Sequence, residues 1–135
     1  SAILSPAADT NVIAVGSVDG NLERSSFSNY ATTGASVDLM APGGSSSHAT
    51  SCLGVRSTVL NDSYGCLQGT SMASPFAAGV AALLLSQNPK LTPDELKTIL
   101  INTAYYDENT MTPDAYGAGI ICADKALGAT SQCGQ

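Results

Sequence analysis

The chain has 135 residues, of which 44% are hydrophobic and only 12% charged, so it suits one globular domain or part of a larger one rather than a disordered or coiled-coil chain. Eleven Asp and Glu against five Lys and Arg give a formal net charge of −6, and we therefore set aside nucleic acids and anionic membranes as partners. No apolar run approaches the length of a membrane span. Residues 1–5 lack the basic and apolar regions of a signal peptide.

Four β-strands are predicted in the first half of the chain. They cover residues 11–16, 37–41, 55–59 and 64–68. The first two are apolar runs that end at glycine or at Pro-Gly, which is typical of buried strands in a parallel sheet. The last two flank a turn at 61–63 and predict a hairpin. Polar turns and loops are expected at 17–21, 24–30 and 43–51.

Two helices are predicted in the second half. The run 76–85 is apolar on nearly every face and therefore predicts a central, buried helix, with Pro75 in its first turns, where a missing N–H costs little. It ends at Asn88-Pro89. The second helix begins with Thr92 as N-cap, Pro93 at the first position and Glu95 completing a capping box. Its predicted inward face consists of Leu96, Ile99, Leu100 and Thr103. A polar loop at 105–113 follows.

The four cysteines form two pairs that are close in sequence, Cys52 with Cys66 and Cys122 with Cys133. Four cysteines allow three pairings, and we expect the local one because each pair brackets a loop containing Gly and Ser. Such disulfides would imply a secreted or periplasmic protein. The alternative is four buried free thiols. The chain has no CxxC and a single histidine, so a zinc site is not expected.

The turn that precedes the apolar helix carries the candidate chemistry. Gly69, Thr70 and Ser71 would place the Ser71 hydroxyl at a helix N-terminus, where free backbone N–H groups and the helix dipole favour developing negative charge. A nucleophilic serine with an oxyanion hole needs this environment. The alternative is an ordinary helix N-cap.

The string Gly-Thr-Ser-Met-Ala-Ser-Pro at 69–75, with the Ala- and Leu-rich helix behind it, resembles the nucleophile signature of the subtilisin family of serine proteases. Further family landmarks occur in family order at 12–16, 24–30, 37–43 and 116–121. The resemblance implies an α/β, three-layer fold with a mainly parallel sheet flanked by helices. It also implies that residues 1–135 are the C-terminal half of a peptidase catalytic domain.

The family assignment implies a serine endopeptidase that works through an acyl-enzyme, with Ser71 as nucleophile and with Gly69, Thr70 and Met72 shaping its turn. Oxidation of Met72 would impair such an enzyme. The family's triad runs Asp, His, Ser along the chain, and only the serine has a counterpart here. The missing acid, base and oxyanion Asn would come from the N-terminal half as a separate chain, so residues 1–135 alone are expected to be inactive and to fold poorly. His48 lies in a polar loop without a family counterpart and is not expected to act as the base.

Two other functions compete with that of a peptidase. An inactive fragment of this fold could serve as a binding or scaffold module, although such a module has no need of an intact nucleophile motif. An α/β-hydrolase esterase is excluded because the chain has no Gly-x-Ser-x-Gly.

The resemblance also implies a structural calcium site, while the chemistry itself requires no cofactor. In family members of the proteinase K type, two backbone carbonyls and an Asp hold the ion, and the matching positions are Thr10, Val12 and Asp38. The alternative is that Asp38 caps a turn or pairs with Arg24. Leu4 falls near the first specificity pocket, which it would narrow or make apolar. Phe76 replaces a family histidine that is not the catalytic one.

Overall fold

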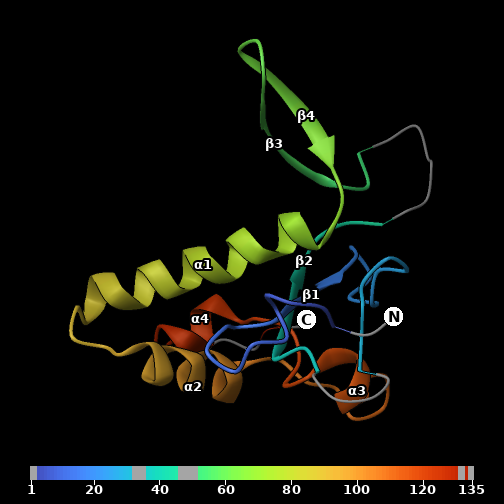
Figure 1. The fold of residues 1–135 in the computed structure, drawn as a ribbon. Helices are drawn as coiled ribbons and strands as arrows, with labels where there is room; N and C mark the ends of the chain where they lie inside the picture. The colour runs from blue at the N-terminus through green and yellow to red at the C-terminus, as the bar shows by residue number, and fades with distance from the viewer. Residues whose placement is uncertain (1–2, 32–35, 46–51, 131–132, 134–135) are drawn as a thin grey trace.

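The computed structural model describes residues 3–31, 36–45, 52–130 and 133. Within these residues the strands precede the helices along the chain, and together they form a mixed α/β fold, as the sequence predicts (Figure 1). The elements in chain order are β1 (Val15–Val18), β2 (Leu39–Pro42), β3 (Val55–Val59), β4 (Ser63–Leu67), α1 (Thr70–Gln87), α2 (Pro93–Thr103), α3 (Pro113–Tyr116) and α4 (Ala123–Ala126). No helix in these described stretches has the length and apolar character needed to cross a membrane.

The centre of the molecule is a pair of parallel strands. β1 pairs with β2 in a register that runs from Val15 opposite Leu39 to Val18 opposite Pro42. A parallel bridge from Met40 to Ile120 extends the pair on the other edge of β2. The mainly parallel sheet that the family resemblance implies is therefore represented, within the described residues, by two strands and one bridge.

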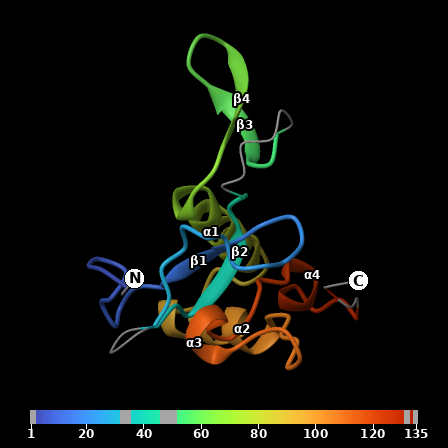
Figure 2. The same ribbon diagram turned by 90° about the vertical axis from the view of Figure 1, so that its right-hand side faces the viewer.

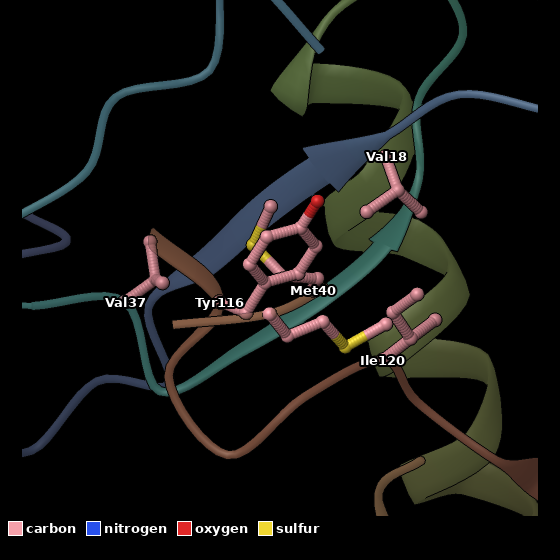
Figure 3. Close-up of a cluster of buried hydrophobic side chains, with 6 residues drawn as sticks. Val18, Val37, Met40, Tyr116 and Ile120 are labelled. Carbon is pink, nitrogen blue, oxygen red and sulfur yellow. The ribbon is translucent and has the colours of Figure 1, made fainter. Parts of the chain in front are cut away.

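Side chains that alternate along β2 enter two different hydrophobic clusters. Leu39 packs with α1 and α2 through Ala77, Val80 and Leu100. The next residue, Met40, packs with Val18, Val37, Met111, Tyr116 and Ile120, a cluster that contains no residue of α1 or α2 (Figure 3). Successive side chains of a strand point to opposite faces, so the strand pair forms the middle of three layers.

β1 begins four residues later than the predicted strand at 11–16. The Ala14 N–H donates to the Asp38 carboxylate instead of to a strand neighbour, with an N···O distance of 2.7 Å. Val12 belongs to a turn in which its N–H donates to the Asp9 carbonyl at 3.2 Å. The turn expected at 17–21 begins later than predicted, because Ser17 and Val18 lie within β1.

α1 has Ser71 at its N-terminus, as predicted, but its proline position and its burial differ from the prediction. The helix starts at Thr70, so Pro75 lies inside it and cannot donate to the Ser71 carbonyl one turn back. Its buried residues form a single stripe, namely Ala73, Ala77, Val80 and Leu84. The other side is apolar but exposed: Phe76 is 44%, Leu83 49% and Leu85 36% accessible. The sequence of α1 is apolar enough for a fully buried helix, but the described residues cover only one of its faces.

α2 agrees with its prediction. Thr92 is the N-cap, Pro93 occupies the first turn and the reciprocal capping box between Thr92 and Glu95 is formed. Leu96 and Leu100 are buried against the α1 side of the sheet. The exposed Glu95 carboxylate accepts the Thr92 N–H and hydroxyl, and these hydrogen bonds lower its pKa.

The β3–β4 hairpin is antiparallel, as predicted, and projects from the rest of the molecule in both views (Figures 1 and 2). The Cys52–Cys66 disulfide ties the base of the hairpin to the preceding segment, and the Cys122–Cys133 disulfide ties the chain after α4 to the residue before that helix. The structure thus contains the local pairing, with Cα atoms 5.7 and 5.9 Å apart. Most of the predicted loop at 43–51 falls outside the described residues.

Candidate active site

Ser71 is the second residue of α1, and its side chain is exposed to solvent. The first hydrogen bonds of the helix come from the N–H groups of Met72 and Ala73, which donate to the Gly69 carbonyl at 2.9 and 3.3 Å. The N–H groups of Thr70 and Ser71 precede these bonds and therefore lie at the positive end of the helix. Gly69, at the N-cap, has no side chain to cap them. Among the described residues, the turn therefore presents a hydroxyl beside amide donors that no carbonyl accepts.

The conformation of Gly69 explains why a glycine precedes Thr70 and Ser71. Its φ of 146° and ψ of 164° define a backbone region that is essentially restricted to glycine. The Gly69 N–H donates to the Gly43 carbonyl at 2.9 Å, which ties the turn to the segment just after β2. A Cβ on Gly43 would collide with the Ser17 hydroxyl and would approach the Gly69 carbonyl to 2.7 Å. The sheet end and the turn can pack this closely because residue 43 is a glycine, whereas Gly69 is required by its backbone conformation.

A buried network of serine hydroxyls holds the segment on which this turn rests. Ser25 Oγ donates to the Gly44 carbonyl at 2.6 Å and accepts from Ser17 Oγ, 2.7 Å away. Ser28 Oγ accepts the Ser17 N–H at 2.9 Å. All three serines are buried, with 3% or less of their surface accessible. Sequence reasoning missed this network because serines near a loop are ordinarily solvated, and nothing in the pattern marks them as core residues.

Two hollows border the nucleophile turn. Ser71 and Met72 line one of about 330 Å³, together with residues of β3 and of the first turns of α1. Thr70 lines another of about 180 Å³, together with Leu4, Phe27 and Val37. The structure therefore brings Leu4, which the sequence places near the specificity pocket, to the same cavity as Thr70.

The described residues bring no imidazole to Ser71. The chain has one histidine, His48, and it lies outside the described residues. The candidate site of this chain is thus the turn at 69–71, with the exposed Ser71 hydroxyl beside the amide groups that begin α1.

Two of the three predicted calcium ligands converge on a lysine. Lys97 Nζ lies 2.9 Å from Asp38 Oδ2 and donates to the Val12 carbonyl at 3.2 Å. Thr10 lies in an exposed turn. Arg24, the alternative partner of Asp38, instead donates to the Ser28 carbonyl and stacks on the Tyr30 ring, 4.5 Å from its centre. Lys97 was not predicted, because a lysine on an amphipathic helix gives no signal beyond a solvated face.

The fold and the turn together define an α/β protein with an exposed serine at the N-terminus of a helix that packs on parallel strands, a class in which serine hydrolases occur. The chain belongs to the subtilase family, whose sequence pattern matches residues 1–119. Subtilisin DY of Bacillus licheniformis is 42% identical over 121 residues, covering 90% of this chain and 39% of that protein. M-protease of Shouchella clausii (strain KSM-K16) is 40% identical over 121 residues, covering 90% and 28%.

Solved structures agree. A protease from Pseudoalteromonas arctica PAMC 21717 superimposes with a TM-score of 0.81 at 41% identity, over 94% of this chain and 38% of that one. The epidermin leader peptide processing serine protease of Staphylococcus aureus gives 0.79 at 28% identity, over 97% and 33%. The chain spans less than half the length of each of these relatives. The family and fold are thereby established for the part of the domain that this chain represents.

Proposed function

We propose that this chain supplies the nucleophile half of a secreted serine endopeptidase, with Ser71 as the attacking residue. The observation that carries the proposal is the position of Ser71: an exposed hydroxyl on the second residue of α1, beside amide groups that precede the helix's own hydrogen bonds. Membership of the subtilase family supports the reaction class. The two disulfides are consistent with secretion, because such bonds persist in oxidising compartments.

In the proposed reaction the Ser71 Oγ attacks the scissile peptide carbonyl while its proton passes to a base from outside the described residues. The negative charge that develops on the carbonyl oxygen is stabilised by the Ser71 N–H and by the positive end of α1. Collapse of this intermediate expels the amine, which takes the proton, and leaves an acyl-Ser71 ester. Water then hydrolyses the ester. These steps use no cofactor, and they do not require a calcium ion at Thr10, Val12 and Asp38, the positions that the family resemblance implies.

The base, its acid partner and the second oxyanion donor are proposed to come from the complementary, N-terminal half of the domain. The apolar outer face of α1, where Leu83 is 49% and Phe76 44% accessible, supports this assembly because such a helix face is ordinarily covered. Residues 1–135 would then be the C-terminal half of the catalytic domain. Intact mass measurement under denaturing, non-reducing conditions distinguishes a complementary half on a separate chain, as the sequence analysis proposes, from one on the same polypeptide.

Peptide hydrolysis by the complete protein tests the proposal. Ser71→Ala should abolish activity; in subtilisin, a member of this family, loss of the nucleophile is known to cost about 10⁶-fold in kcat. Ser74→Ala is the matched control, because Ser74 is an exposed serine nearly one turn further along the same helix, and it should retain activity. Hydrolysis that survives Ser71→Ala would contradict the proposal and would favour a binding or scaffold role for this fold.

A further inference from the structure

Lys97 connects α2 to the beginning of both parallel strands. Its ammonium group lies 2.9 Å from Asp38 Oδ2, directly before β2, and donates to the Val12 carbonyl at 3.2 Å, shortly before β1. The same Asp38 oxygen accepts the Ala14 N–H at 2.7 Å. The lysine and aspartate side chains are 27% and 23% accessible, so the pair is partly shielded from water.

These oxygens coincide with two of the three calcium ligands that the sequence predicts. A calcium ion needs six to eight oxygen ligands at about 2.3–2.6 Å. With the ammonium in place, both the Asp38 oxygen and the Val12 carbonyl are already directed at a positive charge. A divalent ion bound to the same two oxygens would lie within a few ångströms of that ammonium, and the two cations would repel each other. The residues present therefore fit a calcium ion poorly.

We propose that Lys97 is a built-in cation that takes the place of a bound metal ion at this position. Its ammonium neutralises Asp38, satisfies the Val12 carbonyl and links α2 to the strand pair that carries the nucleophile turn. The structure of this region therefore does not depend on calcium. This inference rests on the contacts of Lys97 alone and holds whether or not Ser71 is catalytic.

Hydrogen exchange of the complete protein, followed by mass spectrometry, provides a local test that is insensitive to calcium bound elsewhere. The peptides to follow cover residues 12–15 and 38–40, in EGTA and in millimolar calcium. Lys97→Met removes the ammonium and keeps most of the aliphatic stem. Lys90→Met is the control, since the Lys90 side chain is exposed in the loop between α1 and α2.

The wild-type protein should show the same protection of both peptides in EGTA and in calcium. In EGTA, Lys97→Met should exchange about fivefold faster in these peptides, as expected for the loss of an ion pair of this exposure, while Lys90→Met should match the wild type. Protection of the wild-type peptides that rises with calcium would overturn the proposal, and so would a Lys97→Met protein that exchanges like the wild type. If Lys97→Met does not fold, the wild-type comparison decides by itself.

Discussion

The helices α1 and α2 are neighbours in sequence and pack on the same face of the strand pair, yet this chain treats them differently. α2 buries Leu96 and Leu100 and leaves Asp94, Glu95 and Thr98 exposed, so that it is complete as a surface helix. α1 buries one stripe of small and aliphatic residues and leaves Phe76, Leu83 and Leu85 exposed. The difference supports the proposal that a complementary part of the domain covers the outer face of α1, the helix that carries Ser71, whereas α2 needs no such cover.

The largest expected effect on stability comes from truncating two neighbouring leucines of α1, Leu83 and Leu84. In the complete protein, Leu84→Ala should cost about 2–5 kcal/mol of unfolding free energy, since Leu84 is buried, with only 4% accessible. Leu83 is 49% accessible in this chain. If the complementary half covers the outer face, Leu83→Ala should cost a similar amount of unfolding free energy. Denaturant unfolding of both variants measures the difference. A Leu83→Ala effect within about 0.5 kcal/mol, as for a surface position, would show that the face stays uncovered.

The next effect concerns the support beneath the start of α1. Ser25→Ala should destabilise the complete protein by about 1–3 kcal/mol, because it leaves the Ser17 hydroxyl and the Gly44 carbonyl buried without a partner. Ser17→Ala should cost less, since Ser25 can still donate to Gly44. The activity of Ser25→Ala should also fall, because Gly43 and Gly44 hold the Gly69 turn. A Ser25→Ala protein as stable as the wild type would mean that the network does not support this segment.

The N-cap of α2, by comparison, should contribute to stability without affecting the candidate site. Thr92→Ala removes the hydroxyl that accepts the Glu95 N–H at 3.3 Å and should cost about 1 kcal/mol, the usual value for an N-cap. Activity at Ser71 should be unchanged at temperatures where the variant is folded. Thermal unfolding and peptide hydrolysis measured on the same sample test both statements. A loss of activity in the folded variant would link α2 to the site more closely than the structure suggests.

The smallest effect is the pH dependence of the same cap. The pKa of Glu95 is lowered by its hydrogen bonds to Thr92, so its contribution to stability is present above the ordinary pKa of a glutamate and is lost as the pH falls through the depressed value. Glu95→Gln does not titrate. The stability advantage of the wild type over this variant should therefore be full at neutral pH and vanish in acid, as measured by urea unfolding at a series of pH values. A constant difference would contradict this account.

Short sequence patterns correctly predicted the elements that depend on residues close together in the chain. The capping box at Thr92 and Glu95, the β3–β4 hairpin and the helix start beside Ser71 follow from residue types at short spacing. The family signature around Ser71 added the fold and the reaction class, which no spacing argument could supply.

What the sequence did not reveal depends on contacts between distant residues. β1 starts late because Asp38, 24 positions away, takes the Ala14 N–H. Lys97 reaches Val12 across 85 positions, and the buried serines depend on the approach of Gly43 and Gly44. The exposure of α1 reflects what this chain contains rather than the apolar character of the helix. Patterns within one element cannot show which of its faces the rest of the protein covers.

The rate at which a fluorophosphonate probe labels Ser71, located by peptide mapping, tests the central claim most directly. The account predicts an adduct on Ser71 in the complete protein and no detectable adduct in residues 1–135 alone, because the activating base lies outside this half. A folded, complete protein in which Ser71 stays unlabelled would contradict the assignment of the nucleophile. Equally fast labelling of the isolated chain would contradict the division of the site, because it would place the base, with His48 as the sole histidine, within these residues.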